Sequence, residues 1–251
     1  AIETERDPVN TIRYRVLRAL KKMQLAQALR LNTEYLEKRP NDQDAQDRQL
    51  SLLSTLSLDD ELIAAISQYQ ERDGYDVVVV QASLTYLLIG NDKDAIRAFA
   101  KTALERVGDS AFVMYQAHRA LLWAGDVDGA SGLSQMIQSS DLPEISRLMV
   151  RLRQACAENR LTDATRIHDR IKANYADNTS TMWISNRIMR KEQDAFEDLI
   201  GLDENEDLSG IGDFLSYAYF DARPFPNLTA LLKTQGIVPR QPLDIPYRCE
   251  I

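Results

Sequence analysis

A helix, a sharp turn and a second helix recur along this chain, and this hairpin pattern limits the possible folds more than any other feature. The clearest copy spans residues 79–99. We expect Asp76 to cap its first helix, Gly90 to end that helix, and Asp92 to cap the second helix. Small Ala95 should let the two helices approach closely. A chain built from such units is predicted to be all-α.

The hairpins follow one another at a nearly regular spacing. An alanine early in each second helix marks six units: Ala28, Ala65, Ala95, Ala130, Ala164 and Ala195. The intervals between these alanines are 37, 30, 35, 34 and 31 residues. Gly90, Gly125 and Asn159 each stand five residues before their alanine. The sequence therefore predicts a solenoid of about six helical hairpins with a C-terminal capping segment.

A period of about 34 residues with two helices per unit is the signature of tetratricopeptide repeats. Pro40 and Pro143 fall twelve and thirteen residues after their alanines, where such a repeat ends. From residue 8 to residue 203 the chain resembles the tetratricopeptide-repeat family. The resemblance implies a right-handed superhelical solenoid whose first helices line a concave groove.

Composition excludes several classes of function. The chain is 44% hydrophobic and 27% charged, which is ordinary for a globular protein. Its net charge of −8 disfavours non-specific nucleic-acid binding and a polybasic membrane anchor. It has no apolar run of about 18 residues, so no membrane span is predicted, and it has no secretory signal. Because it begins with Ala1 rather than Met, we expect a processed chain or a piece of a longer protein.

The residues that carry chemistry are few. His118 and His168 lie 50 positions apart without metal-ligand spacing, and are expected on helix faces. Cys156 and Cys249 form neither a disulfide framework nor a metal cluster, and both are predicted to be free thiols. No phosphate-binding glycine loop is present. We therefore expect no enzyme activity, no catalytic residues, no metal and no cofactor.

The pattern changes after Gly201. Residues 203–207 form an acidic turn, residues 209–212 a glycine-containing joint, and residues 214–220 an aromatic run. Asn227 is expected to cap a short helix that Gly236 ends. The proline-rich residues that follow should lie extended across the final helices. We predict a repeat domain at 1–203 and a capping helix with an extended tail at 204–251.

The ending carries a second resemblance. Residues 219–228 read Tyr-Phe-Asp-Ala-Arg-Pro-Phe-Pro-Asn-Leu, and residues 245–249 read Ile-Pro-Tyr-Arg-Cys. This string resembles the C-terminal end of bacterial multidomain regulators, in which tetratricopeptide repeats follow a TolB-like segment and a winged-helix or adenylate-cyclase domain. It implies a sensory or interaction portion whose effector domain lies elsewhere. It also implies the periplasmic side of an inner-membrane regulator, although soluble relatives with the same repeats are cytoplasmic.

The tetratricopeptide resemblance assigns groove positions to particular side chains. They are Arg13, Tyr115, Arg119, Trp123, Arg153 and Arg187. Arg119, Arg153 and Arg187 recur at one constant interval, as a ladder of one arginine per repeat would. Guanidinium groups pair bidentately with carboxylates, so the ladder predicts an acidic peptide or a C-terminal carboxylate as partner. Alternatively, these arginines pair with neighbouring Asp and Glu or only solvate a helix face.

Two functions follow from these patterns. In the first, the chain is a protein-interaction or sensor domain that holds a peptide in its groove, with Tyr115 and Trp123 as apolar anchors. In the second, it self-associates as a dimer and positions an absent effector domain. The second function would place Trp183 and the aromatic run in the dimer interface rather than in the cover of the last helices.

Overall fold

The computed structural model describes residues 8–73, 76–206 and 214–250. Within these residues the secondary structure is helical without strands, so the predicted all-α class is confirmed. The helices in chain order are α1 Pro8–Lys21, α2 Leu25–Lys38, α3 Gln43–Thr55, α4 Asp59–Asp73, α5 Val77–Tyr86, the 3-10 helix η1 Leu87–Gly90, α6 Lys93–Val107, α7 Ala111–Trp123, α8 Val127–Gln138, α9 Glu144–Ala157, α10 Leu161–Tyr175, α11 Thr179–Ile188, α12 Glu192–Glu204 and α14 Pro226–Thr234.

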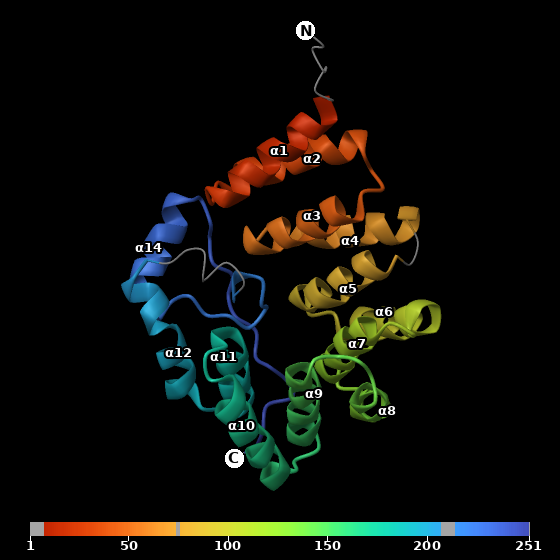
Figure 1. The fold of residues 1–251 in the computed structure, drawn as a ribbon, viewed down its shortest axis with the longest axis vertical. Coiled ribbons are helices and arrows are strands. Elements are labelled where there is room, and N and C mark those ends of the chain that lie inside the picture. The colour runs from red at the N-terminus through yellow and green to blue at the C-terminus, as the bar shows by residue number, and fades with distance from the viewer. Residues whose placement is uncertain (1–7, 74–75, 207–213, 251) are drawn as a thin grey trace.

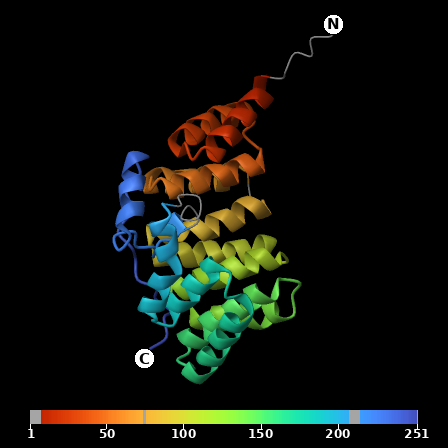
Figure 2. The same ribbon diagram turned by 60° about the vertical axis from the view of Figure 1, so that its left-hand side comes forward.

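Consecutive helices pack as pairs, and the pairs stack in chain order along a curve (Figure 1). The first helices of successive pairs, from α3 through α5, α7 and α9 to α11, pack against one another. Residues 214–250, here called the C-terminal segment, return along the stack instead of continuing it (Figure 2). The predicted boundary between residues 203 and 204 falls in the last turn of α12.

Each pair turns at one residue with a left-handed backbone, and these residues recur at a regular interval. They are Met23, Ser57, Asn91, Gly125, Asn159 and Arg190. The first four intervals between them are identical, and only the last is shorter. In the Gly125 turn, the Asp126 N–H donates to Leu121 O at 2.8 Å, which is a typical helix-ending bond. Gly90 is the last residue of η1, as predicted, but the left-handed conformation expected of it is taken by the next residue, Asn91.

A fully buried residue stands five positions after each left-handed residue. These residues are Ala28, Leu62, Ile96, Ala130, Ala164 and Ala195, each at most 2% exposed. The alanine register was therefore wrong in two pairs, because Ala65 is only half-buried and Ala95 is exposed. The buried position predicted for Ala95 belongs to its neighbour Ile96. Leucine and isoleucine also occupy this position, so small size alone does not identify it.

Side-chain caps fix several helix starts. Asp76 accepts from Val79 N at 3.3 Å and Asp92 accepts from Ala95 N at 3.0 Å, which confirms both predicted caps. Asn227 does not cap α14, whose N-cap residue is Phe225. The free N–H groups at the start of α14 are capped by a side chain of another helix instead.

That cap comes from Asp203, near the end of α12. Its Oδ1 atom accepts from Leu228 N at 2.8 Å, and its side chain is buried. An acidic side chain at a helix N-terminus is favourable because it meets the unpaired N–H groups there. The contact fixes α14 against the last helix pair.

The aromatic run of the C-terminal segment is buried around Trp183 on α11. The Trp183 ring stacks on Tyr219 with centroids 5.6 Å apart and meets Phe214 edge-on at 5.3 Å. Trp183, Phe214, Tyr219 and Phe220 are each buried. Their burial matches the predicted role as cover of the final helices, and it leaves none of these rings at the surface for a dimer interface.

Candidate partner-binding face

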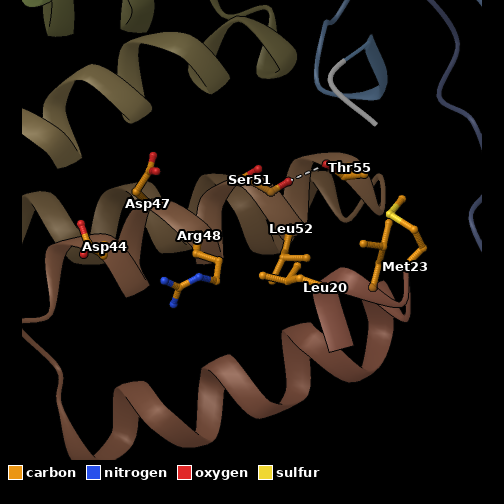
Figure 3. A pocket seen from close by; sticks show the side chains of 9 residues that line it. Leu20, Met23, Asp44, Asp47, Arg48, Ser51, Leu52 and Thr55 are labelled. Carbon is orange, nitrogen blue, oxygen red and sulfur yellow. Dashed lines mark hydrogen bonds between the residues drawn. The ribbon is translucent and has the colours of Figure 1, made fainter. Parts of the chain in front are cut away.

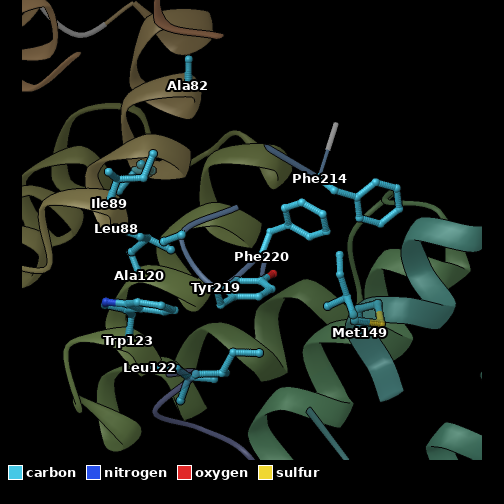
Figure 4. Packing of buried hydrophobic residues seen from close by; sticks show 14 of the residues in the cluster. Ala82, Leu88, Ile89, Ala120, Leu122, Trp123, Met149, Phe214, Tyr219 and Phe220 are labelled. Atoms are coloured by element: carbon cyan, nitrogen blue, oxygen red, sulfur yellow. The ribbon is translucent and has the colours of Figure 1, made fainter. Parts of the chain in front are cut away.

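Four of the six residues predicted to line a groove come from α7 and α9, on the side of the stack that meets the C-terminal segment. We call this side, which carries Tyr115, Arg119, Trp123 and Arg153, the inner face. Figure 4 shows Tyr219 of the C-terminal segment lying between Trp123 and Met149. The inner face is therefore occupied by another part of the same chain.

Trp123 is one of the two predicted anchors, and its ring is already engaged. It is 1% exposed, and its centroid lies 6.1 Å from that of Tyr219 and 6.4 Å from that of Tyr247. Its indole N–H donates to Asn91 Oδ1 at 3.1 Å. Asn91 is the left-handed residue of the preceding pair, so the ring also locks two neighbouring hairpins together.

The two central arginines are buried. The Arg119 Nη2 atom donates to Thr85 O at 3.2 Å, on α5. The Arg153 Nη2 atom donates to Tyr115 Oη at 3.1 Å, and its guanidinium lies 5.0 Å from the centre of the Tyr115 ring. Within the described residues neither arginine forms an ion pair with a carboxylate. The alternative that they pair with Asp or Glu or solvate a helix face is wrong for both.

Several polar atoms of these side chains have no hydrogen-bond partner among the residues that the structure describes. They are Arg119 Nε, Arg153 Nε and Arg153 Nη1. A buried charge without an opposite charge is costly, and the cation–π contact with Tyr115 offsets only part of that cost. The inner face thus holds two guanidinium groups with unused capacity for an acidic group.

Arg187, the third member of the predicted arginine ladder, and Arg13, the remaining predicted groove arginine, lie in different surroundings. Arg187 forms an ion pair with Glu192, and burial lowers the pKa of Arg187. Arg13 on α1 is exposed. The four predicted arginines therefore do not form one continuous stripe; only Arg119 and Arg153 share the buried inner face.

His118 lies beside Arg153 inside the core, not on an open helix face. Its Nε2 atom is 3.0 Å from Gln154 Oε1, and the Gln154 amide nitrogen donates to Val127 O and Glu158 Oε1. Those two bonds make Oε1 the acceptor, so His118 carries its proton on Nε2. Burial, followed by the Arg153 charge, lowers the pKa of His118 to about 3. A neutral imidazole next to a cation fits a structural role.

His168 is also buried. Its Nε2 atom lies 2.8 Å from Asn186 Oδ1, and the Asn186 amide donates to Asp198. Burial is the main cause that lowers the pKa of His168. This network joins α10, α11 and α12, and it holds the sixth pair against the fifth.

Cys156 and Cys249 form a disulfide, so the prediction of two free thiols is wrong. The bond joins α9 to the end of the chain across 93 residues, and both sulfur-bearing side chains are buried. The Cys249 N–H donates to Ile188 O at 2.9 Å, which adds a second attachment to α11. The pair escaped sequence analysis because nothing in the spacing shows that the tail returns to α9.

Arg240 attaches the same segment near the other end of the stack. Its guanidinium donates to Ser54 O and Leu215 O, each at 2.6 Å, and pairs with Asp59 at 2.8 Å. A single side chain thus bridges α3, α4 and the aromatic run. Sequence reasoning missed it because Arg240 stands in a proline-rich stretch without periodicity.

An open groove remains beside the region that the C-terminal segment covers. It has a volume of about 450 Å³ between the first two helix pairs. Figure 3 shows Leu20, Met23, Leu52 and Arg48 around this space. Leu25, Asp44, Asp47, Ser51 and Thr55 complete the lining. Burial raises the pKa of Asp47. The groove offers apolar contact and both signs of charge.

Membrane-spanning helices and metal clusters are both absent from the residues that the structure describes. None of the described helices has the length and apolar character needed to cross a bilayer. No group of three or more His, Cys, Asp or Glu residues is placed to hold a metal ion within the described part of the chain. The family models, the curated proteins and the solved structures contain no match to this chain.

Proposed function

We propose that this chain is a non-catalytic protein-interaction or sensor domain of a bacterial regulator, built as a right-handed tetratricopeptide-like solenoid of about six hairpins. The constant spacing of the first five left-handed turn residues supports the repeat assignment. Residues 204–251 serve as the capping unit. The ligand of the domain is an extended segment of a partner protein, which the inner face recognises.

One observation carries the proposal: the inner face already holds an extended polypeptide. The tail, residues 238–250, contains Pro239, Pro242 and Pro246 and has no helix or strand over its length. It places Tyr247 on Trp123 and ends at the disulfide to α9. Prolines favour an extended backbone that loses little entropy on binding, which is a common feature of groove ligands.

The partner segment enters at the groove between the first two helix pairs and competes with the tail further along. Beneath the tail, Arg119 and Arg153 have nitrogen atoms that no described residue pairs with, and a carboxylate of the partner would satisfy them better than the tail does. An acidic residue at the position now taken by Tyr247 is therefore favoured in the partner.

The disulfide bond also supports a proposal about the compartment in which the protein works. Disulfide bonds persist in oxidising surroundings such as the bacterial periplasm and are rare in the cytosol. The buried Cys156–Cys249 bond therefore supports work on the periplasmic side of the inner membrane, as the second resemblance implies.

The test asks whether the inner face binds a peptide in trans. A fluorescein-labelled peptide of residues 238–250, with Ser at position 249, is titrated with the full chain and followed by anisotropy. The full-length Arg240→Ala/Cys249→Ser variant, whose own tail has lost two attachments, should bind it in the micromolar range. The wild-type chain should bind at least tenfold more weakly because its tail competes at a high effective concentration.

A peptide of the same composition in scrambled order is the control for non-specific binding. Far-UV circular dichroism establishes that the variant keeps its helices. If the folded variant binds the scrambled peptide as well as the native one, or binds neither, the inner face is not a peptide-recognition surface and the proposal fails.

A further inference from the structure

The solvent-facing side of α1 carries an apolar and basic stripe. Tyr14, Leu17, Arg18 and Lys21 follow one another at helical spacing, while Ile12, Val16 and Ala19 are buried on the opposite side. Tyr14 is 73% exposed and Leu17 is 45% exposed. Residues 8–22 contain five basic side chains and no acidic one, on a chain whose net charge is −8.

The solvent-facing side of α12 has the complementary character at the same spacing. Glu197, Ile200, Gly201 and Glu204 lie exposed in a row. Helix α12 contains six acidic residues and no basic one. Ile200 is 36% exposed, and a Cβ built on Gly201 would meet nothing within 4 Å. This surface therefore combines an apolar centre, room for a large side chain and acidic flanks.

These two surfaces lie apart on one molecule. Helix α1 stands at one end of the stack. Helix α12 belongs to the last pair and lies away from α1 in both views (Figures 1 and 2). Some acidic side chains of α12 are already used, since Glu192 pairs with Arg187 and Arg248 and Asp203 caps α14. Glu197 and Glu204, which flank Ile200, form no ion pair within the described residues.

We propose that α1 of one copy of this chain docks on α12 of a second copy. Tyr14 and Leu17 cover Ile200 and the open space at Gly201, while Arg18 and Lys21 face Glu197 and Glu204. The contact is head-to-tail, so each copy keeps one free α1 and one free α12 for further copies, and the assembly is a ring or a short filament. It does not depend on peptide binding at the inner face.

Charge complementarity between the two helices favours a second copy over an unrelated partner. One helix pair buries less surface than a stable complex requires, so the association should be weak and sensitive to salt. Sedimentation velocity of the full chain at 5 to 500 µM should show a rising average mass in 50 mM NaCl. In 500 mM NaCl the association constant should fall at least tenfold.

Two charge-reversed variants make the test specific. Arg18→Glu/Lys21→Glu should be monomeric because the docking surfaces of its α1 and α12 are then both acidic, and Glu197→Lys/Glu204→Lys should be monomeric because both docking surfaces are then basic. An equimolar mixture of the two should associate again. The control Lys38→Glu/Lys93→Glu makes the same change in net charge as Arg18→Glu/Lys21→Glu, on exposed positions of α2 and α6, and should associate like the wild type.

Three results would overturn the proposal. They are a wild-type chain that stays monomeric at 500 µM in 50 mM NaCl, charge-reversed variants that associate like the wild type, and a mixture that stays monomeric. All the changed positions are exposed, and identical circular dichroism spectra would show that folding is preserved.

Discussion

At the scale of single residues, the turn positions explain why this chain keeps its period without one fixed turn residue. Six residues, five of them not glycine, take the left-handed backbone within the hairpin turns. Non-glycine residues lose about 1–2 kcal/mol in that conformation. Of these six residues, only Gly125 avoids this cost. Glycine positions in the sequence therefore do not reveal most of the turns.

Substitutions at two turns should therefore have opposite effects. Gly125→Ala should lower the free energy of unfolding by about 1–2 kcal/mol, because φ at this residue is +80° and the new Cβ gains no contact. Ser57→Gly should raise it by up to about 1 kcal/mol, because φ there is 56°. Urea denaturation measures both. Equal effects of the same sign would contradict the backbone explanation.

His118 gives a prediction for pH dependence. Its folded-state pKa is about 3, below the ordinary value of 6.5, so the unfolded chain takes up a proton over this range and the folded chain does not. The corresponding stability is present above pH 6.5 and is lost as pH falls toward 3. Between pH 7.5 and pH 5 the loss should be about 2 kcal/mol.

The variant His118→Gln isolates this contribution, because His168 and the carboxylates titrate in both proteins. The wild type should lose about 2 kcal/mol more than the variant over the same pH interval in urea denaturation. Parallel pH profiles for the two proteins would show that His118 becomes protonated in the folded state.

At the scale of the elements, the sequence predicted the helices well because local signals determine them. Asp76 and Asp92 cap their helices as expected, and the hairpin period follows from the buried positions. The cap of α14 could not be predicted, because Asp203 reaches it from 25 residues away. The same limit hid the Cys156–Cys249 bond and the Arg240 contacts. Tyr115, Arg119, Trp123 and Arg153 lie on α7 and α9, the first helices of their pairs, but their cover by the tail was not foreseen.

The attachment of the C-terminal segment to α3 and α4 depends on Arg240. Arg240→Ala should lower the free energy of unfolding by about 2–3 kcal/mol, because it removes charged hydrogen bonds to Ser54 O, Leu215 O and Asp59. Hydrogen exchange at residues 238–243 should become faster.

The matched control is Arg223→Ala, which removes an exposed pair with Asp221 and should change stability by less than about 0.5 kcal/mol. Equal effects of the two substitutions would contradict the bridging role of Arg240.

At the scale of the whole molecule, the C-terminal segment folds back and packs along the stack of helices. The C-terminal segment touches α3 through Arg240, α7 through Tyr247, α9 through Cys249 and α11 through Tyr219. It therefore connects pairs that are distant in sequence, which stacking of neighbours alone does not do. A partner that binds the inner face has to displace this connection.

The most direct test of this account is peptide mapping of the unreduced chain by mass spectrometry, after secretion into an oxidising compartment. The thiols are alkylated in denaturant before digestion. The structure predicts one cross-linked product that joins the Cys156 peptide of α9 to the Cys249 peptide of the tail, and no alkylated cysteine. If both cysteines are alkylated and no cross-linked product is found, the tail is not fixed on the inner face and the central claim is contradicted.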